Sequence, residues 1–192
     1  SWGSPGDLPA IGDFDGDGKA DPAIFRPADH RFYVLQSSNG VVLVSRPSPN
    51  DVPVSGDFDF DGKADFATFG EGRWNWSRSS DGHLSGVMDF WGSAGDNPAA
   101  GDYDGDGKLD LAIFRPSDGV WYIKKSSGGN DFVPFGIASD IPSPGDFDGD
   151  GRTDIAVYRN GVWYILRSSS GILITQFGLA NDLPLTAAGP PQ

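Results

Sequence analysis

The sequence has no cysteine, so disulfides play no part in holding its fold together. Glutamate is almost absent, since Glu71 is the single Glu among 27 acidic residues, and there are only two histidines, His30 and His83. No stretch shows a capped helical pattern of convincing length, and no apolar run approaches the length of a membrane span. These absences argue against a disulfide scaffold, a helical fold and insertion into a membrane.

Basic residues are also scarce, because 14 Lys and Arg stand against 27 acidic residues and leave a formal net charge of -13. Nucleic-acid binding needs a basic stripe, so this balance argues against it. No Gly-rich phosphate loop is followed by a helical pattern. Sixteen of the 26 aspartates lie in four short loops, which indicates that the acidity serves those loops rather than a solvating coat.

Four nine-residue stretches carry Asp at positions 1, 3, 5 and 9 and Gly at position 6. They are residues 13–21, 57–65, 102–110 and 146–154. Carboxylates at alternate positions of a tight loop can converge on one hard cation, and Ca²⁺ takes about six to eight oxygen ligands. Position 6 needs a residue that tolerates positive φ, and the main-chain carbonyl of position 7 is the expected backbone ligand.

We therefore predict four Ca²⁺ ions, one per loop. The predicted carboxylate ligands are Asp13, Asp15, Asp17, Asp21, Asp57, Asp59, Asp61, Asp65, Asp102, Asp104, Asp106, Asp110, Asp146, Asp148, Asp150 and Asp154. The predicted carbonyl ligands belong to Lys19, Lys63, Lys108 and Arg152. Mg²⁺ is disfavoured because it demands octahedral geometry and keeps its waters. The loop is not an EF-hand, because it lacks a Glu at position 12 and the following residues predict a strand.

The loops recur every 44 or 45 residues within a longer repeat. A short Pro-containing segment precedes each loop, and an apolar run follows it, at residues 23–25, 66–69, 111–114 and 155–158. A third segment opens on an aromatic residue and ends in a serine pair, at residues 37–38, 79–80, 126–127 and 168–169. A fourth segment closes the repeat. Four antiparallel strands in about 44 residues is the size of one β-propeller blade.

We therefore predict an all-β fold, a single β-propeller domain over residues 1–192, built of four-stranded antiparallel blades. The repeats span approximately residues 4–47, 48–92, 93–136 and 137–178. Residues 179–192 are interpreted as a partial fifth repeat or a closing tail, because Asp182-Leu183-Pro184 starts a repeat without a metal loop. A four-bladed ring within one chain is favoured. Three alternatives stay open: a larger ring, a pairing of two chains, and a piece of a longer array. The last is suggested by Ser1-Trp2-Gly3, which resembles the end of a fourth strand.

The combination of aromatic-Gly closing a strand, a Gly/Pro segment and DxDxDGxxD before an apolar strand resembles the FG-GAP repeat. Over residues 1–178 the chain looks like the calcium-loaded blades of integrin α-subunit propellers and of bacterial surface proteins of the VCBS/FG-GAP type. The resemblance implies the fold and the metal. It does not single out one function, because such blades occur in adhesins, lectins and enzyme accessory domains. The second repeat departs from the pattern, with Phe60 for the usual loop Gly and Arg46-Pro47 for aromatic-Gly.

We expect no enzymatic activity. His30 and His83 are not at equivalent repeat positions, and the clustered aspartates are charged ligands, whereas glycoside hydrolysis needs one protonated acid. The expected function is a calcium-binding module, secreted or at the cell surface, that binds a glycan or a protein. Calcium loops that rely on millimolar ion favour this location. The alternatives are an accessory or partial catalytic propeller of a polysaccharide-degrading enzyme and a structural repeat of a surface array. Self-association is expected if the ring is not closed within one chain.

Recurring aromatic and basic residues outside the loops have structural interpretations. Trp74, Trp121 and Trp163 share one repeat position, which favours the core between blades over sugar-stacking pockets. Trp76 stands apart, because its counterparts in the other repeats are aliphatic. Arg26, like its counterpart in the third repeat, Arg115, follows Ile-Phe and precedes Pro, and is expected to pair with a nearby Asp or to cap a turn.

Overall fold

A computed structural model describes residues 3–45 and 51–184 of the protein. Three sequence predictions fall at least partly outside these residues. They are the strand end at Ser1-Trp2, the departure at Arg46-Pro47 and most of the closing tail, from residue 185 onward. The described residues contain no helix, and hence none with the length and hydropathy to cross a membrane.

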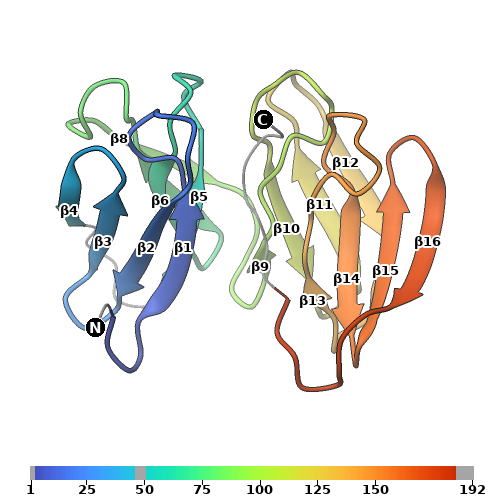
Figure 1. The fold of residues 1–192 in the computed structure, drawn as a ribbon. Helices are drawn as coiled ribbons and strands as arrows, with labels where there is room; N and C mark the ends of the chain where they lie inside the picture. Colours follow the sequence, from blue (N-terminus) through green and yellow to red (C-terminus); the bar gives the residue numbers. More distant parts are fainter. Residues whose placement is uncertain (1–2, 46–50, 185–192) are drawn as a thin grey trace. The chain divides into compact units, whose positions relative to one another are not determined.

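Within residues 3–45 and 51–184, sixteen strands form four antiparallel sheets in which neighbouring strands follow one another along the chain (Figure 1). Blade one consists of β1 (Leu8–Gly12), β2 (Asp21–Arg26), β3 (Arg31–Gln36) and β4 (Gly40–Ser45). Blade two consists of β5 (Val52–Gly56), β6 (Asp65–Gly70), β7 (Arg73–Ser77) and β8 (Gly86–Phe90). Blade three consists of β9 (Asn97–Pro98), β10 (Leu111–Arg115), β11 (Val120–Lys124) and β12 (Asn130–Pro134). Blade four consists of β13 (Ile141–Pro142), β14 (Ile155–Arg159), β15 (Val162–Arg167) and β16 (Gly171–Gln176).

This confirms the predicted fold class, an all-β protein of the β-propeller type with four four-stranded blades. In every blade the acidic loop joins the first and second strands. The first strands β9 and β13 are only two residues long, and single bridges, Gly101 to Asp110 and Gly145 to Asp154, continue their pairing to the end of the loop. The acidic loop therefore closes a hairpin whose two ends are held by main-chain hydrogen bonds.

The described residues divide into two compact units, one ending at Phe90 and one beginning at Trp91. The first unit holds blades one and two, and the second holds blades three and four. Each unit has an apolar core of its own between its two blades. The closure of all four blades into one ring, and with it the single-domain boundary, stays a prediction.

The core of the first unit is mostly phenylalanine. Phe25 and Phe32 of blade one and Phe66 of blade two are almost fully buried, and the rings of Phe32 and Phe66 lie 5.2 Å apart. Phe14, from the first acidic loop, stacks on Phe66 with ring centroids 4.7 Å apart. The residue at loop position 2 therefore anchors the loop of blade one to the neighbouring blade.

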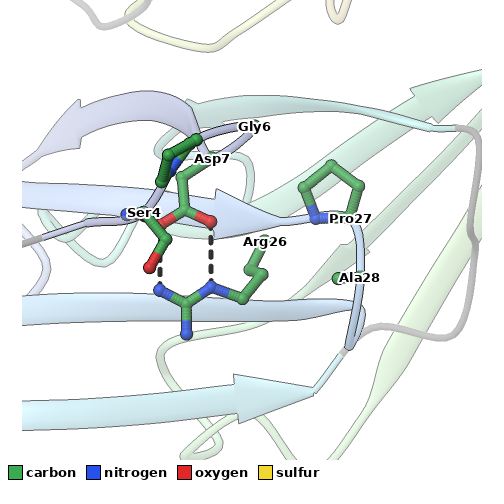
Figure 2. A pocket seen from close by; sticks show the side chains of 7 residues that line it. Ser4, Gly6, Asp7, Arg26, Pro27 and Ala28 are labelled. Atoms are coloured by element: carbon green, nitrogen blue, oxygen red, sulfur yellow. Dashed lines mark hydrogen bonds and ion pairs between the residues drawn. The ribbon is translucent and has the colours of Figure 1, made fainter.

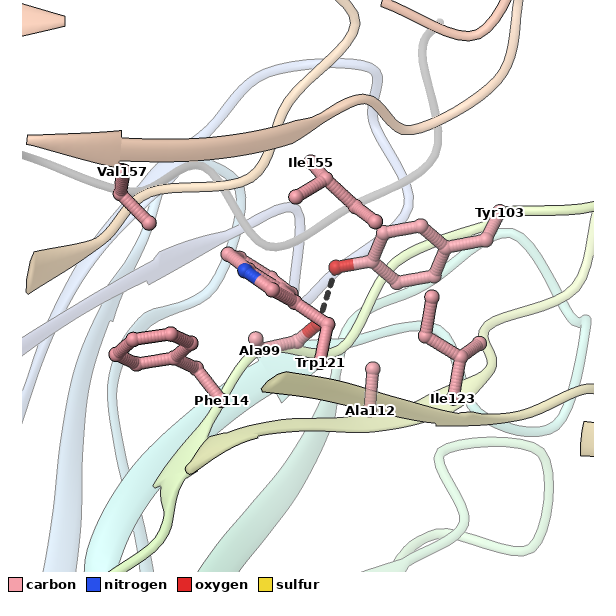
Figure 3. Packing of buried hydrophobic residues seen from close by; sticks show 8 residues of the cluster. All are labelled: Ala99, Tyr103, Ala112, Phe114, Trp121, Ile123, Ile155 and Val157. Atoms are coloured by element: carbon pink, nitrogen blue, oxygen red, sulfur yellow. Dashed lines mark hydrogen bonds between the residues drawn. The ribbon is translucent and has the colours of Figure 1, made fainter. Parts of the chain in front are cut away.

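The core of the second unit lies between β10, β11 and β14 (Figure 3). Trp121 is fully buried beside Phe114, and Tyr103 from the third acidic loop donates its hydroxyl to the carbonyl of Ala99 at 2.7 Å. Trp74, at the same repeat position in blade two, is also fully buried. The prediction of a core between blades is thus confirmed for Trp121, and Trp74 is confirmed as buried, against Phe69 of its own blade. Trp163 is only half-buried, and its indole N–H donates to the carbonyl of Phe177 at 3.0 Å.

The predicted pairing of the repeated arginines with aspartate is also confirmed. Arg26 binds Asp7 through two N–H···O contacts of 2.9 Å, and Arg115 binds Asp96 through two of 2.8 Å. Asp7 and Arg26 are among the residues that line a pocket (Figure 2). The Arg26 guanidinium also lies over the Tyr33 ring at 4.3 Å, so this pair ties the start of the blade to β2 and β3.

Candidate metal centre

The aspartate at loop position 1 organises the main chain of its own loop. In the third loop, Asp102 accepts the N–H of Gly105 on Oδ1 at 2.7 Å and the N–H of Gly107 on Oδ2 at 2.8 Å. The same two bonds recur in the other loops, from residues 16 and 18 to Asp13, from 60 and 62 to Asp57, and from 149 and 151 to Asp146. Each loop is therefore wrapped around one carboxylate.

Glycine is needed at position 6 as the sequence predicted. Gly18, Gly62, Gly107 and Gly151 have φ values of +82°, +84°, +83° and +86°, in the left-handed region that other residues avoid. The residue at position 4 also has its backbone in the left-handed region in every loop, which the sequence pattern did not predict. There the second loop forces Phe60 to φ +65°, a conformation disfavoured for a residue with a Cβ.

The aspartate at position 9 is buried and joins the loop to the third strand. Asp110 is fully buried and accepts the N–H of Tyr103 at 2.9 Å and the N–H of Ser126 at 2.8 Å. Asp21, Asp65 and Asp154 are equally buried and accept the matching pairs of N–H groups. Burial raises the pKa of Asp65 to about 7 and that of Asp110 to about 6. A nearby cation would therefore favour the ionised form of these two buried carboxyls.

The serine pair at the end of each third strand supports the loop carboxylates, a role that sequence reasoning missed. In blade one, Ser37 donates its hydroxyl to Asp17 and Ser38 donates to Asp15, both at 2.6 Å. The other three blades repeat this arrangement, with Ser79 and Ser80 on Asp61 and Asp59, Ser126 and Ser127 on Asp106 and Asp104, and Ser168 and Ser169 on Asp150 and Asp148. The recurrence of the pair was visible in the sequence, but its target was not.

The structure gathers carboxylate oxygens within 4.8 Å of one another in all four loops. The groups are Asp13, Asp15 and Asp17; Asp57, Asp59 and Asp61; Asp102, Asp104 and Asp110; and Asp146, Asp148 and Asp154. Positions 1 and 3 are common to all four groups, while the third member is position 5 in the first unit and position 9 in the second. Of the predicted carboxylates, Asp21, Asp65, Asp106 and Asp150 lie outside these groups.

The position-7 residues are held by their own main-chain N–H. This group donates to the position-5 carboxylate in every loop, for example from Lys108 to Asp106 at 2.8 Å and from Arg152 to Asp150 at 2.9 Å. Lys19 and Lys63 make the same bond, at 2.9 and 3.0 Å. The role of the four position-7 carbonyls as ligands stays a prediction.

The gathered oxygens suit a hard cation. Oδ1 of Asp59 and Oδ1 of Asp148 are buried atoms without a hydrogen-bond partner in the described structure. The hydroxyl of Ser38 lowers the pKa of Asp15, and that of Ser169 lowers the pKa of Asp148, so both carboxyls are ionised at neutral pH. Buried, unpaired carboxylate oxygens are unfavourable unless a proton donor or a cation meets them. Four such oxygen-only groups could each hold a metal ion.

A family model described as the FG-GAP-like repeat matches the chain twice, over residues 57–113 and 102–157. Together these matches cover residues 57–157, more than half of the 192 residues. They begin at the second acidic loop and run through the fourth, so the repeat includes the loop and the strand that follows it. The comparison with curated protein sequences gives no match.

Several solved structures share the fold. An Agrocybe aegerita lectin, described by its specific recognition of non-reducing terminal N-acetylglucosamine, has a TM-score of 0.59 and 19% identity over 93% of this chain and 53% of its own. Virginiamycin B lyase from Staphylococcus aureus has a TM-score of 0.58 and 11% identity over 94% of this chain and 58% of its own. A Bacteroides caccae protein of unknown function has a TM-score of 0.57 and 14% identity over 94% of this chain and 64% of its own. The chain thus spans between half and two thirds of the length of these three proteins, and the likeness is one of fold.

Proposed function

The chain belongs to the FG-GAP-like repeat family, and we propose that it is a non-catalytic module whose four loops bind Ca²⁺ and whose blades bind an extracellular glycan or protein. One observation carries the calcium proposal. Each loop gathers three carboxylate oxygens, and in every loop two serine hydroxyls, from just after the third strand, donate to the carboxylates at positions 3 and 5. The recurrence of this set in four blades supports a common ligand rather than four chance acidic turns.

Calcium fits the donor set better than other common cations. All donors are oxygens, which excludes a preference for softer metals such as zinc. Each loop is exposed at position 5, although position 1 is half-buried or, at Asp102, buried, so water can complete a shell of about six to eight ligands. A bound Ca²⁺ would supply the positive charge that offsets the carboxylates. The carboxylates and the serine pair would then hold the first hairpin of each blade against the end of its third strand.

The absence of catalysis is proposed because the repeated polar side chains already have structural partners. Position-1 and position-9 carboxylates accept main-chain N–H groups, and the carboxylates that pair with arginine are engaged through both oxygens. A general acid must instead keep a proton available to a substrate. A hydrolase and lyase screen on polysaccharides is expected to show no turnover.

A glycan is the favoured partner, with support from the lectin among the solved structures of like fold. Outer strands of the blades also present exposed aromatic rings suited to stacking against sugars. Phe90 on β8 is 67% exposed and Phe132 on β12 is 58% exposed, and the Phe132 ring meets the edge of Tyr122 at 5.4 Å. Location outside the cell is part of this proposal, because loops of this kind suit millimolar calcium.

Binding to a glycan array with 1 mM Ca²⁺ (about the extracellular level) and with EDTA tests the proposal. We expect binding that EDTA abolishes through loss of the loops' order. The Phe132→Ala variant should remain folded and bind more weakly, while Lys125→Ala, just after the end of the neighbouring strand β11, serves as a surface control. Binding by neither glycans nor extracellular proteins, or turnover of a polysaccharide, would contradict the function proposed here.

A further inference from the structure

Resting on the proposed calcium function, we infer that the metal sites work as coupled pairs, site one with site two and site three with site four. Here each site carries the number of its blade. In each unit, two hydrogen-bonded peptide groups run from the position-7 carbonyl of one loop, its predicted backbone ligand, to the buried position-9 carboxylate of the other. Calcium at either member of a pair is therefore expected to tighten binding at the other.

The link in the first unit begins at the second loop. The N–H of Ala64 donates to the main-chain carbonyl of Asp13 at 2.6 Å. That N–H belongs to the same planar peptide group as the Lys63 carbonyl, the predicted backbone ligand of site two. The Asp13 carbonyl in turn shares a peptide group with the Phe14 N–H, which donates to Oδ2 of Asp21 at 2.9 Å. Two peptide groups thus connect the predicted carbonyl ligand of site two to Asp21, the buried position-9 carboxylate of the first loop.

The second unit repeats the link in every step. The N–H of Thr153 donates to the carbonyl of Asp102 at 2.6 Å, and the N–H of Tyr103 donates to Oδ2 of Asp110 at 2.9 Å. The Arg152 side chain adds two bonds from Nε and Nη2 to the Tyr103 carbonyl, at 3.1 and 2.7 Å. The recurrence between blades one and two and between blades three and four makes the link a property of the blade junction.

Tight packing around the link leaves the two loops little freedom to move separately. A Cβ on Gly12 would lie 2.5 Å from Cβ of Ala64, and one on Gly16 would lie 2.8 Å from Cε of Lys63. Ser55 also donates its hydroxyl to the carbonyl of Ile11 at 2.6 Å, across the same junction. Ordering one loop therefore orders the surface on which the other rests.

The sign of the coupling follows from two effects. A cation on the Lys63 carbonyl polarises its peptide group and strengthens the Ala64 N–H as a donor, which ties the second loop more firmly to the first. The same polarisation draws electron density from the Asp21 carboxylate and opposes the coupling. The loop fixed by the first ion also removes part of the ordering entropy that the second ion must overcome. Repulsion between the ions opposes both, and physiological salt screens it only in part, because position 5 is exposed while position 9 is buried. The net coupling is expected to be positive.

A calcium titration of the full chain followed by the amide NMR signals of Gly18, Gly62, Gly107 and Gly151 reports each site separately. Asp59→Asn is designed to remove site two. It is expected to raise the Gly18 midpoint about fivefold, the lower end of usual allosteric coupling, and to leave Gly107 and Gly151 unchanged. Asp104→Asn should raise the Gly151 midpoint and leave Gly18 and Gly62 unchanged. An unchanged Gly18 midpoint, or equal shifts in both units, would overturn the coupling.

A second variant acts on the link and leaves every carboxylate in place. Ala64→Pro removes the donor N–H and keeps the Lys63 carbonyl, so sites one and two should become independent. Ala20→Pro changes the same position of the first loop without touching the Ala64 bond, and coupling should persist. If Ala64→Pro does not fold, the Ala64 amide signal of the wild type tests the link instead. Calcium at site two should shift this proton downfield and slow its exchange with solvent. An unchanged signal would contradict the link.

The outcomes also separate this inference from the function on which it rests. If no loop binds Ca²⁺, the proposed function fails. If four ions bind with midpoints that are independent in wild type and variants alike, the calcium function stands and the coupling alone is wrong.

Discussion

The main-chain N–H of Ser79 donates to Oδ1 of Asp65 at 2.7 Å, and this bond joins the end of β7 to the buried end of the second acidic loop. The same carboxylate accepts the N–H of Phe58 through Oδ2 at 2.9 Å. One aspartate therefore fixes both the start of its own loop and the strand that carries the supporting serines. The candidate metal centre is a junction of three segments, and its behaviour should depend on all of them.

The first prediction concerns stoichiometry. Wild-type protein dialysed against saturating Ca²⁺ should contain four ions by metal analysis, because all four loops keep their carboxylates. Asp104→Ala removes one carboxylate of the third acidic group and should leave three bound ions. The affinity of the site in blade four should also fall, because sites three and four are expected to be coupled. Lys124→Ala, outside the loops, should retain four. Two or fewer ions in the wild type would contradict a full set of sites.

The second prediction concerns stability. For affinities of roughly 0.1–1 mM, 1 mM Ca²⁺ stabilises the folded state by about 0.4–1.4 kcal/mol per independent site. Thermal unfolding should therefore shift to lower temperature in EDTA, and the shift should shrink in Asp104→Ala. Mg²⁺ at the same concentration is the control, and it should restore less of the loss. An unfolding temperature that is the same with EDTA and with Ca²⁺ would count against calcium as a structural ligand.

The third prediction concerns Phe60, whose φ of +65° places a bulky residue in the left-handed region. Phe60→Gly should relieve about 1–2 kcal/mol of strain but lose about 0.5–1 kcal/mol to the greater freedom of glycine when unfolded. The net gain in the free energy of unfolding is therefore about 0–1.5 kcal/mol, centred on about 0.8 kcal/mol and measurable by urea denaturation.

Gly149 offers the matched reverse experiment, because it occupies the same position of the fourth loop at φ +78° with open space around it. Gly149→Ala should destabilise by about 1 kcal/mol, since no clash contributes and only the backbone conformation is changed. If both substitutions left stability unchanged, the left-handed backbone at position 4 would not be a source of strain.

The fourth prediction concerns the ion pairs that repeat at the start of each blade. Oδ1 of Asp140 lies 2.5 Å from Nε of Arg159, and the Asp140 side chain is fully buried. Arg159→Ala would leave this carboxylate buried without its partner and should lower the free energy of unfolding by about 2–3 kcal/mol. The loss is smaller than for a fully buried ion pair, because the arginine is partly exposed. The more exposed pair of Lys125 and Asp131 is the control, and Lys125→Ala should change stability by less than about 1 kcal/mol in urea unfolding.

The fifth prediction concerns pH. Hydrogen bonding to Arg26 lowers the pKa of Asp7 below its usual 3.8. A lowered folded-state pKa contributes stability above the unfolded pKa, and this contribution is lost as pH falls through the folded value. The stability difference between wild type and Asp7→Asn should therefore be full at pH 6 (about two units above the usual value) and shrink as pH falls below about 4. Urea unfolding at each pH measures it, and a pH-independent difference would contradict the ionic origin.

Much of this architecture could be predicted from the sequence because it is local. Strand order, the acidic loop between the first two strands and the left-handed glycine at position 6 all depend on residues close together in the chain. The period of about 44 residues then fixes the blade size. Arg115 could be expected to find an aspartate because a half-buried arginine needs a partner, although the sequence did not identify Asp96.

Other features were decided by tertiary packing alone. The target of Ser38 lies 23 residues away, and the Ala64 N–H meets Asp13 across a blade junction, so neither contact leaves a local pattern in the sequence. The third member of an acidic group, position 5 in the first unit and position 9 in the second, does not follow from the sequence either, because all four loops carry Asp at both positions. Local sequence determined which side chains each loop carries, whereas packing between strands and blades determined which oxygens meet, because convergence requires segments distant in the chain to be held together.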